Sequence, residues 1–395
     1  MAMLKGKMVI GQSGGPTVVI NQSLVGAILE ARRHDVITGI LGARHGIAGI
    51  MNEDFIDLSL PSADQLETVA ATPAAALGSV RLKPGREECE RVFEVFRKHD
   101  VRYFFYIGGN DSAETAHIIS EMARDADYDF CTVHLPKTID NDLKVTDHCP
   151  GFASAARFVA LAFMGDDRDN AALPGIKINV VMGRHAGFLT AASALARQQE
   201  GDGPHLIYLP ERVFDIASFQ QDVRDVYQRL GRCVIAVSEG VHDAEGNPIA
   251  TTGERDSHGN IQLSGTGALG DFLAARVKEA FPGEKVRVRA DTFGYLQRSF
   301  PTVHSEVDAR EAREVGSFGV NHAVNTGENA SVAIRRLSND PYASECFVTS
   351  LSSVARETTE MSDAFIHDNG HDVTLAWLEY LRPLVGDLPK MGRLG

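Results

Sequence analysis

Residues 7–33 read KMVIGQSGGPTVVINQSLVGAILEARR and contain the repeating unit of the fold in its shortest form. Residues 7–11 predict a short apolar strand, residues 12–16 a glycine-containing turn, and residues 17–33 an amphipathic helix. Small residues in such a turn let backbone N–H groups and the positive helix end face an anion. The turn therefore predicts either a phosphate site or an ordinary tight connection.

The same unit recurs along the chain, which indicates an α/β fold. Strand, turn and helix follow one another again at residues 101–124 and 178–195. Further strand-like runs lie at residues 131–135, 205–209, 233–237 and 286–290. Because parallel strands need crossover connections, strands alternating with helices predict mainly parallel sheets.

The length of 395 residues predicts two domains, since a domain usually spans about 100–200 residues. We expect residues 1–150 plus about 300–365 to form a larger domain. Residues 151–299 are expected to form a smaller domain, and residues 366–395 a C-terminal helix and tail. Residues 243–270, rich in small polar residues, predict an excursion such as a hairpin with a long loop.

Charge and cysteine content exclude several classes of protein. Lys and Arg total 39 against 53 Asp and Glu, a formal charge of −14, which argues against nucleic-acid or membrane partners. No apolar run approaches the roughly 20 residues of a membrane span. The five scattered cysteines include no C-x-x-C pair, which favours a reduced, cytoplasmic protein without a zinc site. An anionic substrate must therefore be held by a local group of cations.

Polar side chains gather in the loops that follow predicted strands. GGNDS at residues 108–112 offers an amide and a carboxylate that can bind Mg²⁺, although Asp and Ser are also ordinary helix caps. PKTIDND at residues 136–142 brings together a cation, a hydroxyl and two carboxylates. MGRHAG at 182–187, SEG at 238–240 and FGYLQR at 293–298 add further charged groups. Ligands of open α/β sheets bind beyond the carboxyl ends of strands, so these loops predict a site.

The first turn also supports a rival hypothesis. GQSGG at residues 11–15 matches G-x-S-x-G, the nucleophile turn of serine hydrolases, with Ser13 as the nucleophile. That fold needs earlier strands to build the sheet and the oxyanion site, and only ten residues precede the motif. We therefore keep the hydrolase as a minor alternative.

Taken in this order, the loops resemble the phosphofructokinase family, specifically its pyrophosphate-dependent branch. The motifs that carry the resemblance cover about the first 300 residues: Gly14-Gly15, Gly108-Gly109-Asn110-Asp111-Ser112, Pro136-Lys137-Thr138-Ile139-Asp140-Asn141-Asp142, Met182-Gly183-Arg184, Ser238-Glu239 and Tyr295-Leu296-Gln297-Arg298. The resemblance implies two similar Rossmann-like three-layer domains with the active site in the cleft between them. It places the phosphoryl donor on the larger domain and the sugar phosphate on the smaller one. It also implies reversible, Mg²⁺-dependent phosphoryl transfer from pyrophosphate to fructose 6-phosphate, a glycolytic step, by a homodimer or homotetramer.

The resemblance also implies roles for individual residues. Asp140 matches the catalytic base, and Arg184 matches a group that offsets charge on the moving phosphoryl group. The remaining substrate contacts that it implies are Thr138, Ile139, Met182, Gly183, Glu239, Tyr295 and Arg298. Arg289 resembles an arginine that family members contribute from a neighbouring subunit.

Donor choice rests on Asp111 and Lys137, where ATP-using relatives carry glycine. The resemblance implies that Asp111 repels ATP and that Lys137 neutralises pyrophosphate, with Gly15 and Arg81 as further donor contacts. One departure is Asn110, which stands where the family usually has a metal-binding aspartate, so Asn110 and Asp111 are both candidate Mg²⁺ ligands. An ATP-dependent enzyme and a non-catalytic sugar-phosphate-binding relative remain the alternatives.

Overall fold

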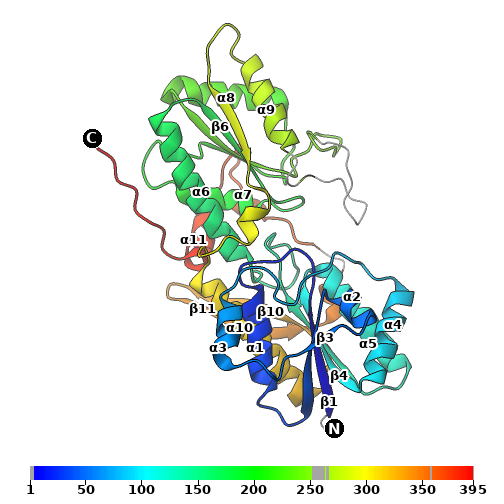
Figure 1. Ribbon diagram of the computed structural model, residues 1–395. Helices are drawn as coiled ribbons and strands as arrows, with labels where there is room; N and C mark the ends of the chain where they lie inside the picture. The colour runs from blue at the N-terminus through cyan, green and yellow to red at the C-terminus, as the bar shows by residue number, and fades with distance from the viewer. Residues whose placement is uncertain (1–3, 251–262, 264–266, 356–357, 395) are drawn as a thin grey trace. The chain divides into compact units, whose positions relative to one another are not determined.

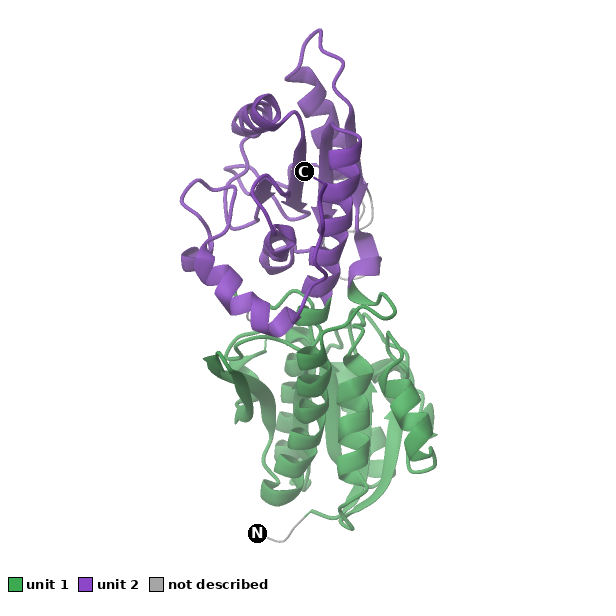
Figure 2. Ribbon diagram, turned by 90° about the vertical axis from the view of Figure 1, so that its left-hand side faces the viewer, with its two compact units in different colours: residues 1–154, 298–359 green, residues 155–297, 360–395 purple. Residues whose placement is uncertain are grey.

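The computed structural model describes residues 4–250, 263, 267–355 and 358–394, and it divides into two compact units (Figures 1 and 2). Unit 1 consists of Met1–Ser154 and Arg298–Thr359, and unit 2 consists of Ala155–Gln297 and Glu360–Gly395. Each unit is therefore assembled from two separate stretches of the chain.

Unit 1 is built on a seven-stranded sheet among the described residues, with the spatial order β11-β10-β5-β4-β1-β2-β3. The strands are β1 (Gly6–Gln12), β2 (Ile37–Ala43), β3 (Phe55–Asp57), β4 (Val101–Gly108), β5 (Cys131–Pro136), β10 (Ala330–Asn339) and β11 (Tyr342–Thr349). Neighbouring strands from β10 to β2 are parallel, and the edge strands β11 and β3 are antiparallel to their neighbours. The predicted α/β class with mainly parallel sheets is confirmed in this unit.

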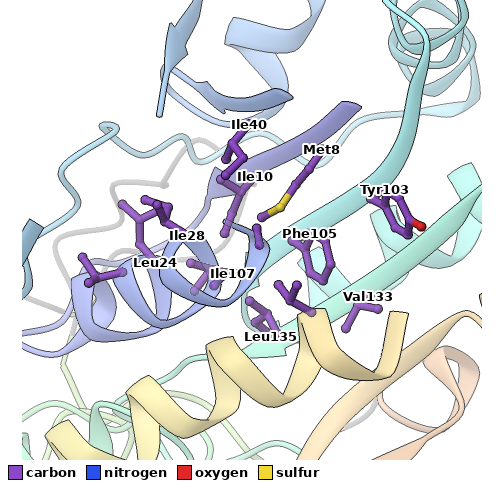
Figure 3. Packing of buried hydrophobic residues seen from close by; sticks show 14 of the residues in the cluster. Met8, Ile10, Leu24, Ile28, Ile40, Tyr103, Phe105, Ile107, Val133 and Leu135 are labelled. Atoms are coloured by element: carbon purple, nitrogen blue, oxygen red, sulfur yellow. The ribbon is translucent and has the colours of Figure 1, made fainter. Parts of the chain in front are cut away.

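Helices cover both faces of this sheet, which gives three layers. The helices are α1 (Ile20–Ala31), α2 (Ile47–Met51), α3 (Ala63–Ala70), α4 (Arg86–Lys98), α5 (Asn110–Asp125) and α10 (Glu306–Thr326), with a short 3₁₀ turn η3 (Leu351–Ser353). Side chains of α1, α3 and α10 share one buried cluster with the sheet, and those of α2, α4 and α5 share another. Figure 3 shows the first cluster, in which Ile10, Phe105 and Val133 come from adjacent strands. Strand β4 is apolar on both faces because both faces are covered.

The strand order places a topological switch point beside β1. From β1 the chain moves outward to β2 on one side, and it later returns to form β4 on the other side. Gln12 at the end of β1 pairs with Ile107, and Gly108 at the end of β4 pairs with Pro136. The loops after β1, β4 and β5 therefore leave the same edge of the sheet at neighbouring points, where open α/β sheets bind ligands.

Unit 2 contains a smaller sheet of four strands among the described residues, in the order β7-β8-β6-β9 and parallel throughout. The strands are β6 (Ile176–Val181), β7 (Leu206–Tyr208), β8 (Cys233–Ser238) and β9 (Val288–Thr292). The helical segments are α6 (Phe152–Ala172), α7 (Phe188–Ala192), η1 (Ser193–Ala196), α8 (Ile216–Leu230), α9 (Ala268–Glu279), η2 (Gly294–Arg298), η4 (Asp363–Phe365) and α11 (Leu375–Val385). The first residues of α6 and the last residue of η2, Arg298, belong to unit 1. Its own buried cluster is formed mainly by the sheet with α8 and α9.

Two details differ from the sequence-based expectation. Helix α1 begins at Ile20 rather than at Thr17, because the Thr17 hydroxyl accepts a hydrogen bond from the Val19 N–H and residues 16–19 form an irregular turn. In the expected excursion at residues 243–270, an antiparallel bridge joins His242 and Pro248. Residues 251–262 and 264–266 of that excursion lie outside the described residues.

No described helix is both long enough and apolar enough to cross a membrane.

A buried ionic network in unit 1 fixes the segment that follows β5. His148 is fully buried, with Nδ1 2.7 Å from Asp147 Oδ2 and Nε2 2.6 Å from Glu311 Oε2. Arg336 donates to the same Asp147 oxygen, and the Tyr342 hydroxyl donates to Glu311. Burial lowers the pKa of His148, but the hydrogen bonds and charges of the two carboxylates outweigh burial and raise it to about 9. The imidazolium therefore joins this segment to α10.

We predict that His148→Gln lowers the free energy of unfolding by about 3–5 kcal/mol at pH 7, because two carboxylates lose their buried partner. Since folding raises the pKa of His148 to about 9, its stabilisation is complete below about pH 6.5 and is lost as pH rises through 9. The difference in the free energy of unfolding between wild type and variant should therefore shrink from pH 7 to pH 9.5. Urea unfolding followed by circular dichroism measures this free energy at each pH.

His34→Gln is the matched control, because His34 also pairs with a glutamate, Glu30 of α1, but keeps 20% of its side chain exposed. We expect this substitution to lower the free energy of unfolding by less than about 1 kcal/mol. An effect of His148→Gln that is the same at every pH would contradict the charged state of His148.

Candidate functional site

The loop after β1 holds a glycine pair whose first member adopts a left-handed backbone conformation. Gly14 has φ +74°, which side-chain-bearing residues rarely adopt. Its N–H donates to the Val80 carbonyl at 3.1 Å, and its own carbonyl accepts from the Ser79 hydroxyl at 2.6 Å. Residues 79–80 therefore fix the turn from outside.

Three cations from separate parts of the chain converge on this glycine turn. A Cβ built on Gly14 would lie 3.2 Å from Lys137 Nζ, and one on Gly15 would lie 2.7 Å from Arg298 Nη1 and 3.9 Å from Arg81 Nη2. Side chains at these two positions would therefore displace the cations. The turn and the three cations form what we call the cation cluster: Gly14, Gly15, Arg81, Lys137 and Arg298.

Lys137 is the deepest member of the cation cluster, with only 4% of its surface exposed. Burial and the nearby charges of Arg298 and Arg81 lower the pKa of Lys137 to about 8, although the carboxylates of Asp140 and Asp142 act in the opposite direction. An anion bound in the cluster would offset both the burial and the repulsion. The arrangement therefore has the electrostatics of a phosphate site.

The loop after β4 brings two oxygen-bearing side chains to the start of α5. The Asn110 side-chain oxygen accepts a hydrogen bond from the Asp111 N–H at 2.9 Å. The Asp111 carboxylate is 52% exposed and lies 3.2 Å from Lys83 Nζ. The same ammonium lies 3.1 Å from a carboxylate oxygen of Glu114, whose side chain is only 8% exposed.

These residues fit a magnesium ion that is shared with a bound phosphate. Within the described residues there is no group of three His, Cys, Asp or Glu side chains that could hold a metal alone. Mg²⁺ usually takes one or two carboxylates, and substrate phosphates and water complete its shell. One exposed carboxylate and one amide oxygen at a helix start match that requirement.

The loop after β5 carries the candidate base. The Lys137 N–H donates to the Gly108 carbonyl at 2.9 Å, which joins this loop to the preceding one. The Asp140 N–H donates to the Thr138 hydroxyl oxygen at 3.1 Å, and both side chains are partly exposed. Ile139 is buried, so a ligand would reach its backbone rather than its side chain.

Asp142 and the candidate base Asp140 are two carboxylates whose charges interact. Burial is the largest cause of the raised pKa of Asp142, about 7, and the Asp140 charge adds to it. The pair therefore carries less than two full negative charges near neutral pH. That relieves part of the repulsion an incoming phosphate would meet.

A neutral histidine supports both loops from below. His134 is fully buried in β5, with Nε2 2.8 Å from the Gly108 carbonyl and Nδ1 2.8 Å from the Ser331 hydroxyl. Because a carbonyl only accepts, Nε2 must carry the proton. Burial lowers the pKa of His134 to about 4, so no extra positive charge is added beneath Lys137.

In unit 2, the loops after β6 and β8 bring together a second group of candidate residues. Val181 pairs with Ser238, so Met182 and Glu239 follow neighbouring strand ends. Gly183 has φ +143°, and its carbonyl accepts from the Ser238 hydroxyl. Glu239 is 7% exposed and donates its N–H to the Val181 carbonyl at 2.9 Å, and Arg184 is half-buried. The loops that carry this carboxylate and this guanidinium thus follow neighbouring strand ends at one sheet edge.

Two further candidates lie elsewhere in unit 2. Tyr295 is 43% exposed in η2. Arg289 is exposed on β9 opposite Lys177, near the amino end of β6, whereas Met182 follows the carboxyl end of β6. Five residues of strand separate Lys177 from Met182, roughly 16 Å. Arg289 therefore does not join the Met182–Glu239 group of its own unit.

Sequence reasoning missed Lys83 and Glu114. Lys83 stands two residues after Arg81 and Glu114 one helical turn after Asp111, but nothing in their spacing indicates that they pair. The Ser13 hydroxyl, proposed in the hydrolase alternative, lies 3.0 Å from the Ser112 hydroxyl. Ser13 is 8% exposed, so it sits beneath the turn and not on it.

Comparisons with known proteins agree with this geometry. A family model described as Phosphofructokinase matches residues 7–322. A Rhodospirillum rubrum protein named pyrophosphate–fructose 6-phosphate 1-phosphotransferase is 57% identical over 388 residues, which are 97% of this chain and 95% of that protein. A Xanthomonas campestris protein of the same name is 41% identical, over 98% of this chain and 93% of that protein. The crystal structure of a pyrophosphate-dependent phosphofructokinase from Marinobacter aquaeolei matches with TM-score 0.86 and 35% identity, over 98% of this chain and 94% of that one.

We predict that pyrophosphate binding draws a proton onto Lys137 above pH 8. The lysine is largely neutral there in the free protein, because its pKa is about 8, and a bound anion favours the charged form. At pH 9 the wild type should take up about one proton more per bound pyrophosphate than the Lys137→Met variant does. At pH 6.5 the two proteins should take up nearly the same number of protons. Calorimetry in two buffers of different ionisation enthalpy measures the uptake.

The variant also corrects for the protons that pyrophosphate itself exchanges, because that contribution is common to both proteins. Lys144→Met is a matched control in the same segment, and its uptake should equal that of the wild type. Equal uptake by Lys137→Met and wild type at pH 9 would remove Lys137 from the anion site.

Proposed function

The chain belongs to the phosphofructokinase family, and we propose that it transfers a phosphoryl group from pyrophosphate to the 1-hydroxyl of fructose 6-phosphate. The products are fructose 1,6-bisphosphate and phosphate, a step of glycolysis. Because an anhydride donor and a phosphoester product differ little in transfer free energy, the reaction should run in both directions.

One observation carries the assignment of the donor. Lys137 lies buried against the Gly14 turn, and the Asp111 carboxylate stands at the start of α5, in the loop after the neighbouring strand β4. ATP would bring a third phosphate and a nucleoside, and a carboxylate at this place would oppose their negative charge. Pyrophosphate carries neither group.

In the proposed mechanism two members of the cation cluster, Arg81 and Lys137, position the donor. Arg81 and Lys137 would bind the pyrophosphate oxygens beside Gly14 and Gly15, whose backbone allows close approach. As the bond to the leaving phosphate breaks, negative charge grows on that phosphate, and Lys137 is placed to stabilise it. The buried position of Lys137 strengthens the effect, since little water screens its charge.

The proposed proton acceptor is Asp140. Its partly exposed carboxylate would accept the proton of the sugar 1-hydroxyl as the oxygen attacks the phosphorus. Thr138 holds the backbone of Asp140 through its hydroxyl, and Arg184 would offset charge on the transferred group. Positioning and charge stabilisation are the main contributions in such transfers.

We assign the sugar phosphate to a second set of residues. Glu239 would accept hydrogen bonds from sugar hydroxyls, and the Met182–Gly183 backbone would contact the sugar. The residue proposed for the 6-phosphate is Arg298, and Tyr295 and a neighbouring subunit's Arg289 are proposed as further substrate contacts. A guanidinium suits that role because it binds phosphate oxygens in pairs.

Enzymes of this family generally use Mg²⁺, and we propose the same here, with Asp111 and Asn110 as protein ligands. When bound, the ion would neutralise phosphate charge and hold the donor oxygens. Asn110 brings no charge, so Asp111 would supply the electrostatic part of the protein's contribution.

The assembly and the compartment are also proposals. Arg289 pairs with the amino end of β6, whereas the Met182–Glu239 group follows the carboxyl end of that strand. This separation supports a contribution of Arg289 to the site of a neighbouring subunit in a homodimer or homotetramer. All five cysteines are free thiols, which supports a reducing, cytoplasmic location.

The first prediction from this proposal concerns the donor. In an assay coupled to formation of fructose 1,6-bisphosphate, we expect kcat/KM with pyrophosphate to exceed that with ATP by at least about a hundredfold, the effect of a like-charge contact of several kcal/mol. Turnover with ATP and none with pyrophosphate would overturn the donor assignment in favour of an ATP-dependent enzyme. Binding of fructose 6-phosphate without turnover by either donor would favour a regulatory protein.

Asp111→Gly should raise activity with ATP by removing the repulsive carboxylate. Asp125→Gly removes the same charge from the far end of α5 and serves as the matched control, with donor preference unchanged. An unchanged donor preference in Asp111→Gly would exclude Asp111 from the discrimination.

The second prediction concerns the base. Asp140→Asn should lower kcat by about 10²–10⁴-fold, the usual contribution of a general base, while fructose 6-phosphate still binds. Asp142→Asn is the matched control and should lower kcat much less, because Asp142 has a pKa of about 7 and is already partly protonated. Steady-state rates and calorimetric binding distinguish the two, and an unchanged kcat in Asp140→Asn would exclude its role.

A further inference from the structure

Lys83 joins two carboxylates that belong to the same face of α5. Its ammonium lies 3.2 Å from Asp111 and 3.1 Å from Glu114, which stand three residues apart on the helix. The two acids are positioned differently: the side chain of Asp111 is 52% exposed and that of Glu114 only 8%. The buried carboxylate has little freedom to move, so Glu114 is the fixed partner and Asp111 is the one that Lys83 can orient.

Residues 79–83, which we call the donor strap, run from the β1 turn to the start of α5. At one end the Ser79 hydroxyl donates to the Gly14 carbonyl at 2.6 Å, and the Val80 carbonyl accepts from the Gly14 N–H at 3.1 Å. At the other end Lys83 binds Asp111 and Glu114. Arg81 lies between these attachments and reaches toward Gly15.

Removal of Lys83 would have two physical consequences. Acids three residues apart on one helix face repel each other, so Asp111 would turn away from Glu114 and leave its present position. The donor strap would also lose one of its two attachments, so Arg81 would be held from one side only. Both consequences concern groups assigned above to the donor.

We propose that Lys83 is a positioning residue for the phosphoryl donor: anchored on Glu114, it holds the Asp111 carboxylate and the Arg81-bearing strap in place. This inference rests on the proposed function, since it concerns how Asp111 and Arg81 are presented to pyrophosphate. Lys83 acts through its two carboxylates and not by binding the donor, because its ammonium is already shared between them.

Kinetics of three variants test the proposal. Lys83→Met should raise KM for pyrophosphate about fivefold, the effect of losing an ion pair worth about 1 kcal/mol. The kcat should change less than about twofold, since Lys137 and Asp140 are untouched, and KM for fructose 6-phosphate should stay unchanged. Glu114→Gln should have the same effect, and Lys83→Arg should restore most of the lost affinity because a guanidinium can bridge both acids.

The double variant Lys83→Met/Glu114→Gln separates positioning from direct binding. If Lys83 acts through Glu114, the double variant should be no worse than Lys83→Met alone. Additive effects would mean that Lys83 binds the donor independently and would overturn the proposal, as would a normal KM in Lys83→Met.

A second measurement does not depend on activity. Trypsin cleaves after Arg81 when the donor strap leaves its place, so the initial rate of cut at the Arg81–Leu82 bond, followed by mass spectrometry, reports on the attachment. We expect Lys83→Met and Glu114→Gln each to be cut about fivefold faster than wild type. Unchanged cutting in both would overturn the proposal even if the enzyme uses pyrophosphate.

Lys98→Met is the matched control, because Lys98 pairs with Glu53 on the surface of α4 at 2.6 Å with 64% of its side chain exposed. Its KM and cutting rate should match wild type. If wild type itself does not use pyrophosphate, the proposed function fails, while the cutting rates still decide whether Lys83 and Glu114 hold the strap.

Discussion

The arrangement on which the rest of the site depends is the approach of Arg81, Lys137 and Arg298 to one glycine turn. Like charges held this close repel, and burial, the larger cause, together with this repulsion lowers the pKa of Lys137 to about 8. The folded chain keeps them together because each comes from a different, independently packed segment. The free energy of that repulsion becomes available when an anion binds, so the cluster is prepared for phosphate before any ligand arrives.

The parallel sheet of unit 1 provides the framework for this cluster. The ends of β1, β4 and β5 are neighbours in the sheet, so three loops that are far apart in the sequence emerge side by side. Uncharged or internally balanced groups support them from below. His134 stays neutral under the Gly108 carbonyl, and the charged His148 is balanced by Asp147 and Glu311. The interior thus carries polar groups without adding net positive charge beneath Lys137.

The negative balance of the whole chain, −14, and its local cation cluster serve different purposes. Acidic groups near the site are individually placed. Asp111 is proposed to oppose a longer donor and Asp140 to take a proton, and the Glu114 carboxylate pairs with Lys83. An acidic protein can therefore host phosphorylated ligands, because short-range placement outweighs a net charge that solvent largely screens.

The sequence by itself determined the α/β class, the family and most of the residues placed at the strand ends, because glycine turns, apolar strands and motif order are local properties. It also singled out Asp111, Lys137 and Asp140, which lie within short motifs. Only the tertiary structure decided that Lys137 and Arg298 meet at Gly14 and Gly15, that Arg289 stands apart from Met182, and that Lys83 reaches Glu114. These facts depend on strand order and on long side chains meeting across loops. No spacing along the chain encodes such meetings, since they arise when separate segments pack against a common sheet.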